Sequence, residues 1–270
     1  MPMPDGLEDS RQHPLRGVLY PARLPTFTRV PAPAAVAELV RWFWIPRWDI
    51  QPGRSSRQQL LPFPACNLVV EGTAVELAGP STRTSHRDLR GTGWAVGALL
   101  RPAAVPHFTA DPAALRDAST VVDAPDLVAA VRDAGPDAAP DVFAEWLAAT
   151  VPPPPREARL ANEMADLIDA DSEIRTVEDA AGRLGLSART LQRLAARYVG
   201  LPPLAMIRRR RLQEAAVRLR ADPSVTLADI AADLGYSDHA HLANEFRAVL
   251  GLTLGSYRRS SVIHVSDPAG

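Results

Sequence analysis

This sequence is short of cysteine and has no lysine. One cysteine, Cys66, stands among 270 residues, and all 30 basic residues are arginine. A single thiol can form neither an internal disulfide nor a multi-thiolate zinc site. We therefore expect Cys66 to be a small buried hydrophobic residue, with a redox-sensing thiol as the alternative.

Long apolar segments and an excess of one charge are missing as well. No apolar run approaches the length that spans a bilayer, and Met1 to Arg11 lack the apolar segment of a signal peptide. We therefore expect a cytoplasmic protein with no membrane partner. The formal net charge is -1, so any nucleic-acid site must come from a local arrangement of charge.

The usual signatures of catalysis and metal binding are absent too. The chain has no glycine-rich phosphate loop, no Gly-x-Ser-x-Gly elbow and no His-Glu-x-x-His pair. Cys66, His86 and His107 lack the spacing of a zinc site. His239 and His241 do not share a helix face. We predict a protein that is not an enzyme and that has no metal and no cofactor.

Four successive prolines, Pro152 to Pro155, divide the chain into two parts, because proline cannot continue a helix and favours an extended connector. Before them, one helix is expected at about Ala34–Trp44, and two short helices at residues 125–151 are joined at Gly135. Short apolar runs in this part predict strands bounded by turns: residues 59–61, 67–71 and 94–100.

After the prolines the periodicity is helical, which gives an α+β protein. We expect a β-rich domain closed by helices, followed by an all-α domain of about seven helices. The predicted boundaries are a flexible N-terminus at 1–20, the β-rich domain at 21–150, a proline linker at 151–155, the helical domain at 156–262 and a flexible tail at 263–270.

A helix, a tight glycine turn and a second helix are predicted at residues 176–198, the outline of a helix-turn-helix. Thr176 and Asp179 have the spacing of a capping box, with aspartate in place of the usual glutamate. Gly185 can end the first helix in a left-handed conformation, and Ser187 can cap the second.

The same outline returns about fifty residues later, and this internal repeat is the most informative feature of the chain. Residues 227–237 repeat the pattern of residues 177–187, with Thr226 in the capping position and a second turn one residue longer. A long helix joins the copies, with these residues on one stripe: Leu204, Ile207, Leu212, Ala215 and Leu219. At about eighteen residues it is about 27 Å long, and major-groove faces recur about every 34 Å. One chain can therefore place two helices in neighbouring grooves.

These segments resemble the AraC/XylS family of transcriptional regulators. The resemblance covers residues 156–259 and rests on Ser187–Arg193, Arg211–Ala215 and Ile230–Asp238, continuing to Phe246-Arg247 and Gly251–Thr253. It implies two helix-turn-helix units joined by a long helix, and sequence-specific control of transcription on double-stranded DNA. RNA polymerase is a further partner that the family suggests, and activation and repression both stay open.

The resemblance directs Arg189, Gln192 and Arg193 toward base edges. The chemistry agrees, because arginine pairs with guanine and glutamine with adenine in the major groove. Arg197, one turn on, is expected at a phosphate.

The equivalent residues of the second unit are His239, Ala240, Ala243 and Asn244, with Arg247 near the DNA backbone. The family usually has arginine at position 244, phenylalanine at 242 and proline at 254, where this chain has Asn244, Leu242 and Leu254. We therefore expect the first unit to carry more of the specificity.

The N-terminal half bears a fainter resemblance to the β-rich sensor domains of AraC-type regulators. It rests on Trp94–Ala103, on Leu115–Asp117 and on the helix expected near the start. It implies a domain that senses a small-molecule effector and can form a homodimer. We predict Trp42, Trp44 and Arg101 for a ligand pocket, since such pockets favour aromatic walls. Core packing is the other use for the two tryptophans.

Two other functions stay open at this point. One is an architectural DNA-binding or repressor protein whose N-terminal half only dimerises. The other is an enzyme with small-molecule chemistry in its N-terminal domain and a regulatory helical tail. For the tandem repeat itself, a protein-docking module is the alternative to DNA binding.

Overall fold

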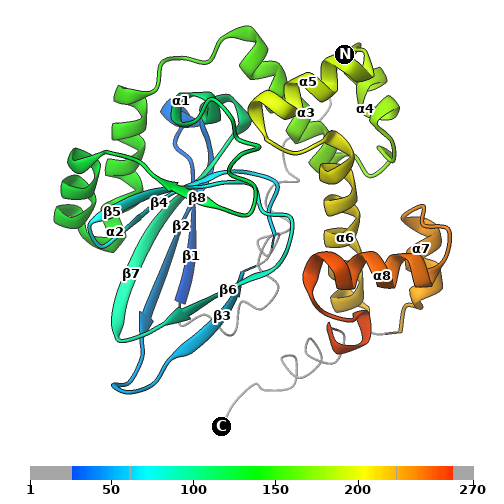
Figure 1. Ribbon diagram of the computed structural model, residues 1–270, viewed down its shortest axis with the longest axis horizontal. Coiled ribbons are helices and arrows are strands. Elements are labelled where there is room, and N and C mark those ends of the chain that lie inside the picture. Colours follow the sequence, from blue (N-terminus) through cyan, green and yellow to red (C-terminus); the bar gives the residue numbers. More distant parts are fainter. Residues whose placement is uncertain (1–25, 61, 223, 258–270) are drawn as a thin grey trace, which may run out of the picture.

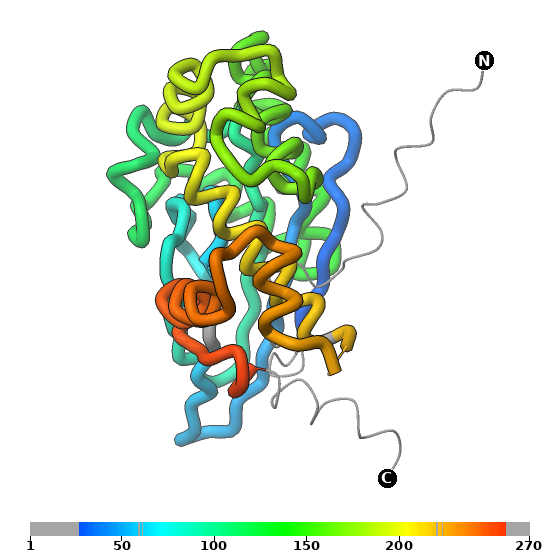
Figure 2. The backbone as a smooth tube through the Cα atoms, turned by 90° about the vertical axis from the view of Figure 1, so that its right-hand side faces the viewer, coloured from blue at the N-terminus to red at the C-terminus, as the bar shows by residue number. Residues whose placement is uncertain are grey.

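The computed structural model describes residues 26–60, 62–222 and 224–257. The flexible segments expected at 1–20 and 263–270 lie outside these residues. Figure 1 shows a twisted sheet with the helix α2 on one side and the helices from α3 onward on the other. In Figure 2, turned by 90°, this helical part extends along the β-rich part from α3 to α8.

Six strands form one sheet in the order β1-β2-β7-β4-β5-β8, and β3 pairs with β6 in a separate two-stranded ribbon. All these pairings are antiparallel. The predicted strands at 67–71 and 94–100 are confirmed as β4 and most of β7. The strands are β1 Thr26–Pro31, β2 Val40–Asp49, β3 Ser56–Leu60, β4 Asn67–Glu71, β5 Ala74–Ala78, β6 Ser85–Leu89, β7 Thr92–Leu100 and β8 Ser119–Val121.

The helix expected at Ala34–Trp44 is wrong. Only a short 3-10 helix, η3 (Ala34–Val36), forms there, and the chain then enters β2. In β2, Phe43 and Ile45 are buried, whereas Trp42 and Trp44 are half-buried on the opposite face. This alternation is the period of a strand, and a run of aromatic and β-branched residues favours a pleated, half-buried surface over a helix.

Helix α2 (Pro125–Thr150) closes the core of the β-rich part. Its backbone leaves helical geometry at Gly135, with φ 70° and ψ 173°, which confirms two helices joined at this residue. Phe143 packs against Phe43 of β2 with ring centroids 5.6 Å apart. After β7 come the short helices η4 (Pro102–Ala104) and α1 (Val105–Phe108), and η4 contacts α3 of the helical part.

The helical part is built around two apolar cores that share the helix α6. The first core joins α3, α4 and α5 to the start of α6, and the second joins the end of α6 to α7 and α8. On the predicted stripe Leu204 is 38% exposed, and the neighbouring Met206 is buried. Helical backbone resumes at 254–257, where the described residues end. The helices are α3 Arg156–Ala170, α4 Val177–Arg183, α5 Ala188–Tyr198, α6 Pro203–Ala221, α7 Leu227–Asp233 and α8 His239–Leu250.

Every helix in the described part of the chain is too short or too polar to cross a lipid bilayer.

Candidate nucleic-acid interface

The first helix-turn-helix begins with the predicted capping box. The Thr176 hydroxyl accepts a hydrogen bond from the Asp179 backbone N–H at 3.1 Å, and the Asp179 carboxylate accepts one from the Thr176 N–H at 2.8 Å. The backbone N–H of Arg175 donates to the same carboxylate at 3.0 Å. Hydrogen bonds from Arg175 and then Thr176 hold the pKa of Asp179 below its ordinary value. Ser187 caps α5 by accepting from the Thr190 N–H at 3.2 Å.

The two turns are built alike. Gly185 and Gly235 have φ of 64° and 71°, a left-handed conformation that glycine adopts without a steric penalty. After α4, the Leu186 N–H donates to Ala181 at 2.9 Å, and after α7 the Tyr236 N–H donates to Ala231 at 2.8 Å. Both are the longer bond of a Schellman motif. The repeated sequence therefore gives the same helix ending twice.

Helix α5 presents one polar face to solvent. Its buried side contributes Leu191, Leu194, Ala195 and Tyr198 to the first core. The predicted residues Arg189, Gln192, Arg193 and Arg197 are all exposed, and their spacing of three and four places them along one side of the helix. The structure thus brings together the four residues predicted for the first unit, with three guanidinium groups among them.

A residue that the sequence did not indicate also touches this face. Glu157 of α3 lies 3.8 Å from the Arg193 guanidinium and 3.1 Å from that of Arg197, measured between nitrogen and oxygen atoms. The same carboxylate accepts a hydrogen bond from the Tyr198 hydroxyl at 3.3 Å. No local pattern marks this residue, because the crossing of α3 and α5 creates the contact.

Helix α8 is the equivalent helix of the second unit. It begins four residues after its turn glycine, whereas α5 begins three residues after its own, so the longer second turn is confirmed. Asp238 caps it by accepting from the His241 N–H at 2.7 Å, and this bond lowers the pKa of Asp238. Leu242, Phe246 and Leu250 are buried. Four of the predicted residues are exposed, namely His239, Ala240, Asn244 and Arg247, whereas Ala243 is half-buried and packs against the second core.

The two exposed faces differ in chemistry. The α5 face offers several planar guanidinium groups, which match guanine and phosphate acceptors in two-point geometry. The α8 face offers one arginine, one histidine, one amide and a methyl group. The first unit therefore exposes more hydrogen-bond donors than the second.

Arginines of α6 join the two units. Arg210 is buried and donates to the carbonyl of Ile174, just before α4, at 2.8 Å. Arg211 lies over the Tyr236 ring, with its guanidinium carbon 3.9 Å from the ring centroid, beside the second turn. Arg218 pairs with Asp233 at the end of α7 at 2.8 Å. Contacts along α6 therefore tie both helix-turn-helix units to one helix.

The residues predicted for a ligand pocket lie in different surroundings. Arg101 lines a cavity between the β-rich and helical parts, whereas Trp42 and Trp44 do not belong to its lining. Trp44 stacks on Phe27 and donates to the Asn67 side chain at 3.0 Å. Cys66 is buried at the cavity wall, and burial raises the pKa of its thiol to about 12, which keeps this thiol protonated and unreactive at neutral pH.

Comparisons with known proteins find relatives of the helical part. A helix-turn-helix domain family matches residues 180–260. AraC-like transcription regulators from Streptomyces lividans and Streptomyces antibioticus are 33% and 32% identical to the chain over 121 residues. Over these residues the chain is similar to AraC-like regulators and carries a helix-turn-helix domain. The matched residues are 45% of this chain and 38% of each relative, so the chain spans about two-fifths of the length of the curated relatives it matches.

Two other comparisons extend beyond the helical part. Residues 28–121 match a domain of unknown function (DUF6597). Among solved structures, ToxT from Vibrio cholerae is 8% identical, with 80% of this chain and 97% of that chain covered and a TM-score of 0.43.

Proposed function

We propose that the protein is a sequence-specific DNA-binding regulator of transcription that places α5 and α8 in neighbouring major grooves of one duplex. In this proposal residues 156–262 form the DNA-binding domain, and residues 21–150 form a sensor or oligomerisation domain. The observation that carries it is the pair of exposed polar faces on α5 and α8, each on the second helix of a helix-turn-helix whose first helix has the same glycine ending.

The dimensions of α6 support this placement. It has 19 residues, which gives a length of about 28 Å at 1.5 Å per residue. Successive major-groove faces are about 34 Å apart, so a modest bend of the duplex would bring both helices into register. Because both units belong to one chain, no dimer is required for two groove contacts.

Each predicted residue has a role that its chemistry supports. Arg189, Gln192 and Arg193 would meet base edges, and Arg197 would meet a phosphate oxygen. In the second unit His239, Ala240 and Asn244 would face bases, and Arg247 would meet the backbone. The richer set of donors on α5 supports a first unit that contributes more of the specificity.

The proposal includes control by an effector that acts on the β-rich part. That part is joined to the helical domain by buried polar contacts. Asn162 of α3 is buried, accepts from the Ala103 N–H and donates to the Glu38 carbonyl, both at 2.9 Å. Arg101 forms an ion pair with Asp166 of α3. A ligand that altered these contacts would alter the position of the DNA-binding helices.

The test compares binding of the purified protein to DNA upstream of its own gene and of neighbouring genes, against unrelated DNA, at two salt concentrations. Arg193→Ala should lose about 1–3 kcal/mol of the preference for one fragment. Arg132→Ala is the matched control, because Arg132 is an exposed arginine on α2, away from both recognition helices.

Three outcomes separate the possible functions. A preferred fragment that Arg193→Ala weakens and Arg132→Ala does not weaken supports the regulator. Equal binding to every fragment, governed by salt alone, supports the architectural DNA-binding protein. Binding to none of the fragments contradicts the proposal and supports a docking module.

A further inference from the structure

Glycines follow both recognition helices at equivalent places of the repeat, and the β-rich part contacts both of them. Gly200 follows α5 with φ 80°, and Gly251 follows α8 with φ 67°. The backbone of Pro112 lies 2.6 Å from the position that a Cβ of residue 200 would occupy. The Thr84 side chain lies 3.9 Å from the equivalent position at residue 251. The β-rich part therefore contacts the same point of the repeat twice.

Each of these contacts includes a hydrogen bond from the β-rich part. The Arg116 guanidinium donates to the Gly200 carbonyl at 2.9 Å. The Thr84 hydroxyl donates at 3.3 Å to the Val249 carbonyl, in the last turn of α8, where carbonyls lack partners within the helix. The two donors belong to two segments, residues 79–84 and 112–118, which we call the bridging loops.

Asp117 joins the two bridging loops. Its carboxylate accepts hydrogen bonds from the Thr82 backbone N–H at 2.7 Å and from the Thr82 hydroxyl at 2.6 Å. Its own backbone N–H donates to the Pro80 carbonyl at 3.1 Å, and the Arg83 guanidinium lies 3.8 Å from the carboxylate. Among the non-glycine residues that the structure describes, Asp117 has the positive φ, 57°, a conformation that persists only where surrounding contacts hold it. The two loops are therefore held together as one unit.

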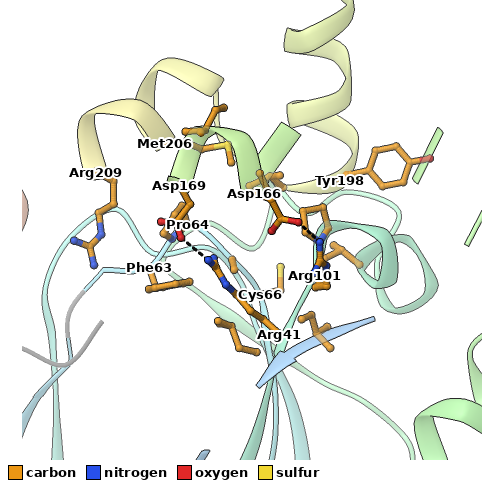
Figure 3. Close-up of a pocket in the computed structure, with 18 of the residues that line it drawn as sticks. Arg41, Phe63, Pro64, Cys66, Arg101, Asp166, Asp169, Tyr198, Met206 and Arg209 are labelled. Atoms are coloured by element: carbon orange, nitrogen blue, oxygen red, sulfur yellow. Dashed lines mark hydrogen bonds and ion pairs between the residues drawn. The ribbon is translucent and has the colours of Figure 1, made fainter. Parts of the chain in front are cut away.

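The β-rich part is also fixed to the first helix-turn-helix unit through α3, which belongs to the first core. Arg41 pairs with Asp169, and Arg101 pairs with Asp166, as the dashed lines of Figure 3 mark. A contact from the bridging loops to α8 therefore holds the second unit relative to the first.

The two units are connected directly by α6, whose residues belong to one core or the other. On this helix the first core ends at Ile207 and the second begins at Leu212, with the buried Arg209 between them. Beside α6, the Arg175 guanidinium donates to the Asp233 carbonyl at a long 3.4 Å. A helix can bend along its length, so α6 by itself permits the separation of α5 and α8 to vary.

We propose that the bridging loops set the separation of α5 and α8, so that the protein reads two half-sites at one spacing. With the loops in place, a change of separation has to break a hydrogen bond as well as bend α6. The duplex, rather than the protein, then adjusts to the difference between a helix of about 28 Å and a groove repeat of about 34 Å. The inference rests on the proposed function, because it needs both helices on DNA. In it Asp117, Arg116 and Thr84 are positioning residues.

The first experiment measures the separation of the helices in the whole chain without DNA, by double electron–electron resonance. The spin labels are attached at Ala196→Cys of α5 and Ala248→Cys of α8, two exposed positions, in a Cys66→Ala background. We expect one narrow distance peak in this chain and a broad distribution when Asp117→Gly is added. Glycine adopts the φ of residue 117 freely, so only the side-chain bonds are lost. Equal widths overturn the proposal.

Two further substitutions detach the bridging loops at their ends. Thr84→Val and Arg116→Met each remove a donor and keep most of the side chain, and together they should broaden the distribution as Asp117→Gly does. Thr92→Val and Arg132→Met are the matched controls and should leave it narrow, because the Thr92 hydroxyl bonds within the β2–β7 pair and Arg132 is exposed on α2. A narrow peak in the combined variant, or equal broadening in the controls, overturns the proposal. If Asp117→Gly does not fold, the combined variant decides.

The second experiment changes the spacing of the half-sites on DNA. The site that the wild type protects in its preferred fragment is synthesised with one or two base pairs inserted or removed between the two half-sites. One turn of about 34–36 Å contains about 10–10.5 base pairs. Each inserted pair therefore moves the second groove by about 3.4 Å and turns it by about 35°.

The affinities for these sites give a spacing ratio for each variant. The wild type should bind the altered sites at least about tenfold more weakly than the natural one, because it loses base contacts of one unit. Asp117→Gly and the combined variant should reduce this ratio by about twofold to tenfold, the factor that loss of one hydrogen bond gives. The two control variants should keep the wild-type ratio, and thermal unfolding shows whether each variant is folded.

The two experiments separate this inference from the proposed function. A spacing ratio that is the same in the wild type and in the folded bridging-loop variants overturns this inference and leaves the DNA-binding regulator standing. A distance distribution that broadens in Asp117→Gly, in a protein whose wild type prefers no DNA fragment, overturns the proposed function, while the control of helix separation by the bridging loops stands.

Discussion

Arg210 is the residue whose loss should most clearly loosen the link between α6 and the first helix-turn-helix unit. Its guanidinium donates to the carbonyls of Ser172 and Ile174 at 3.3 and 2.8 Å and to Glu214 at 3.2 Å. The side chain is 6% exposed. Burial lowers the pKa of Arg210, and the charge of Glu214 partly offsets this effect. Arg210→Met keeps most of the apolar stem and removes only the charged donors.

The size of the effect follows from what the substitution leaves behind. Removing one partner of a buried ion pair costs about 3–5 kcal/mol, because the other partner stays buried without compensation. Here Glu214 is 24% exposed and keeps a hydrogen bond from Arg218 at 2.7 Å, so the cost should be lower, about 2–3 kcal/mol. At 2–4 °C per kcal/mol for a domain of this size, the melting temperature should fall by about 4–12 °C.

Thermal and urea unfolding followed by circular dichroism measure this change. Arg218→Met is the matched control: its side chain is 36% exposed, and exposed pairs contribute about 0–1 kcal/mol each. If Arg210→Met unfolds at the same temperature as the wild type, or costs less than Arg218→Met, the hydrogen bonds of Arg210 do not hold α6 and the apolar cores alone do.

Two further predictions concern the first helix-turn-helix. Glu157→Gln should raise DNA affinity about 1.4-fold to fivefold in fluorescence anisotropy, because Arg193 and Arg197 no longer leave an ion pair worth about 0.2–1 kcal/mol to reach DNA. A fall in affinity would mean that Glu157 positions the two arginines for DNA. The pKa of Asp179 is lower in the folded protein than the ordinary aspartate value. Its carboxylate therefore stabilises the fold at pH values above the ordinary aspartate pKa, and this contribution is lost as the pH falls through the folded-state pKa. Asp179→Asn should therefore reduce the loss of stability between neutral and acidic pH in urea titrations, and an unchanged acid loss would contradict this account.

The helix-turn-helix units could be predicted because their determinants are local. Thr176, Ser187 and Thr226 cap helices through hydrogen bonds that span only three residues. Gly185 and Gly235 end helices in a conformation that the sequence marks with glycine. Because the repeat contains a capping residue and a turn glycine in each copy, the order of the helices could be predicted from the spacing of these residues alone.

The region around Val40 was mispredicted because its apolar residues fit two periods. Val36, Leu39, Val40 and Phe43 lie at helical spacing, and all four are buried. A turn followed by a strand buries the same residues. The pairing of β2 with β1 and β7 decides between them, and no signal within the segment reports that pairing.

The contacts of Glu157 and Arg209 were beyond prediction for a related reason. Glu157 meets Arg193 and Arg197 only because α3 crosses α5. Arg209 stands in a run of four arginines, and the sequence does not tell which of them faces the interior. The run combines an exposed Arg208, the buried Arg209 and Arg210, and a half-buried Arg211. The exposure of these four arginines differs because α6 packs against two apolar cores and a cavity, so each side of the helix has different surroundings.

The β-rich part also touches the ends of both recognition helices. Arg116 donates to the carbonyl of Gly200, just after α5, at 2.9 Å, and the backbone of Pro112 leaves no room for a side chain at that glycine. At the end of α8 the Thr84 hydroxyl donates a hydrogen bond of 3.3 Å to the Val249 carbonyl.

These two attachments are unequal in strength. At α5 a charged donor acts together with close packing, whereas at α8 one neutral hydroxyl bond contributes about 1 kcal/mol. Both units are also tied to α6, so neither can turn without straining that helix. A change in the β-rich part would therefore release α8 at a smaller cost than α5. On this argument the second recognition helix, with its poorer set of base-reading groups, is the one through which regulation would act, and the first would keep the protein on its site.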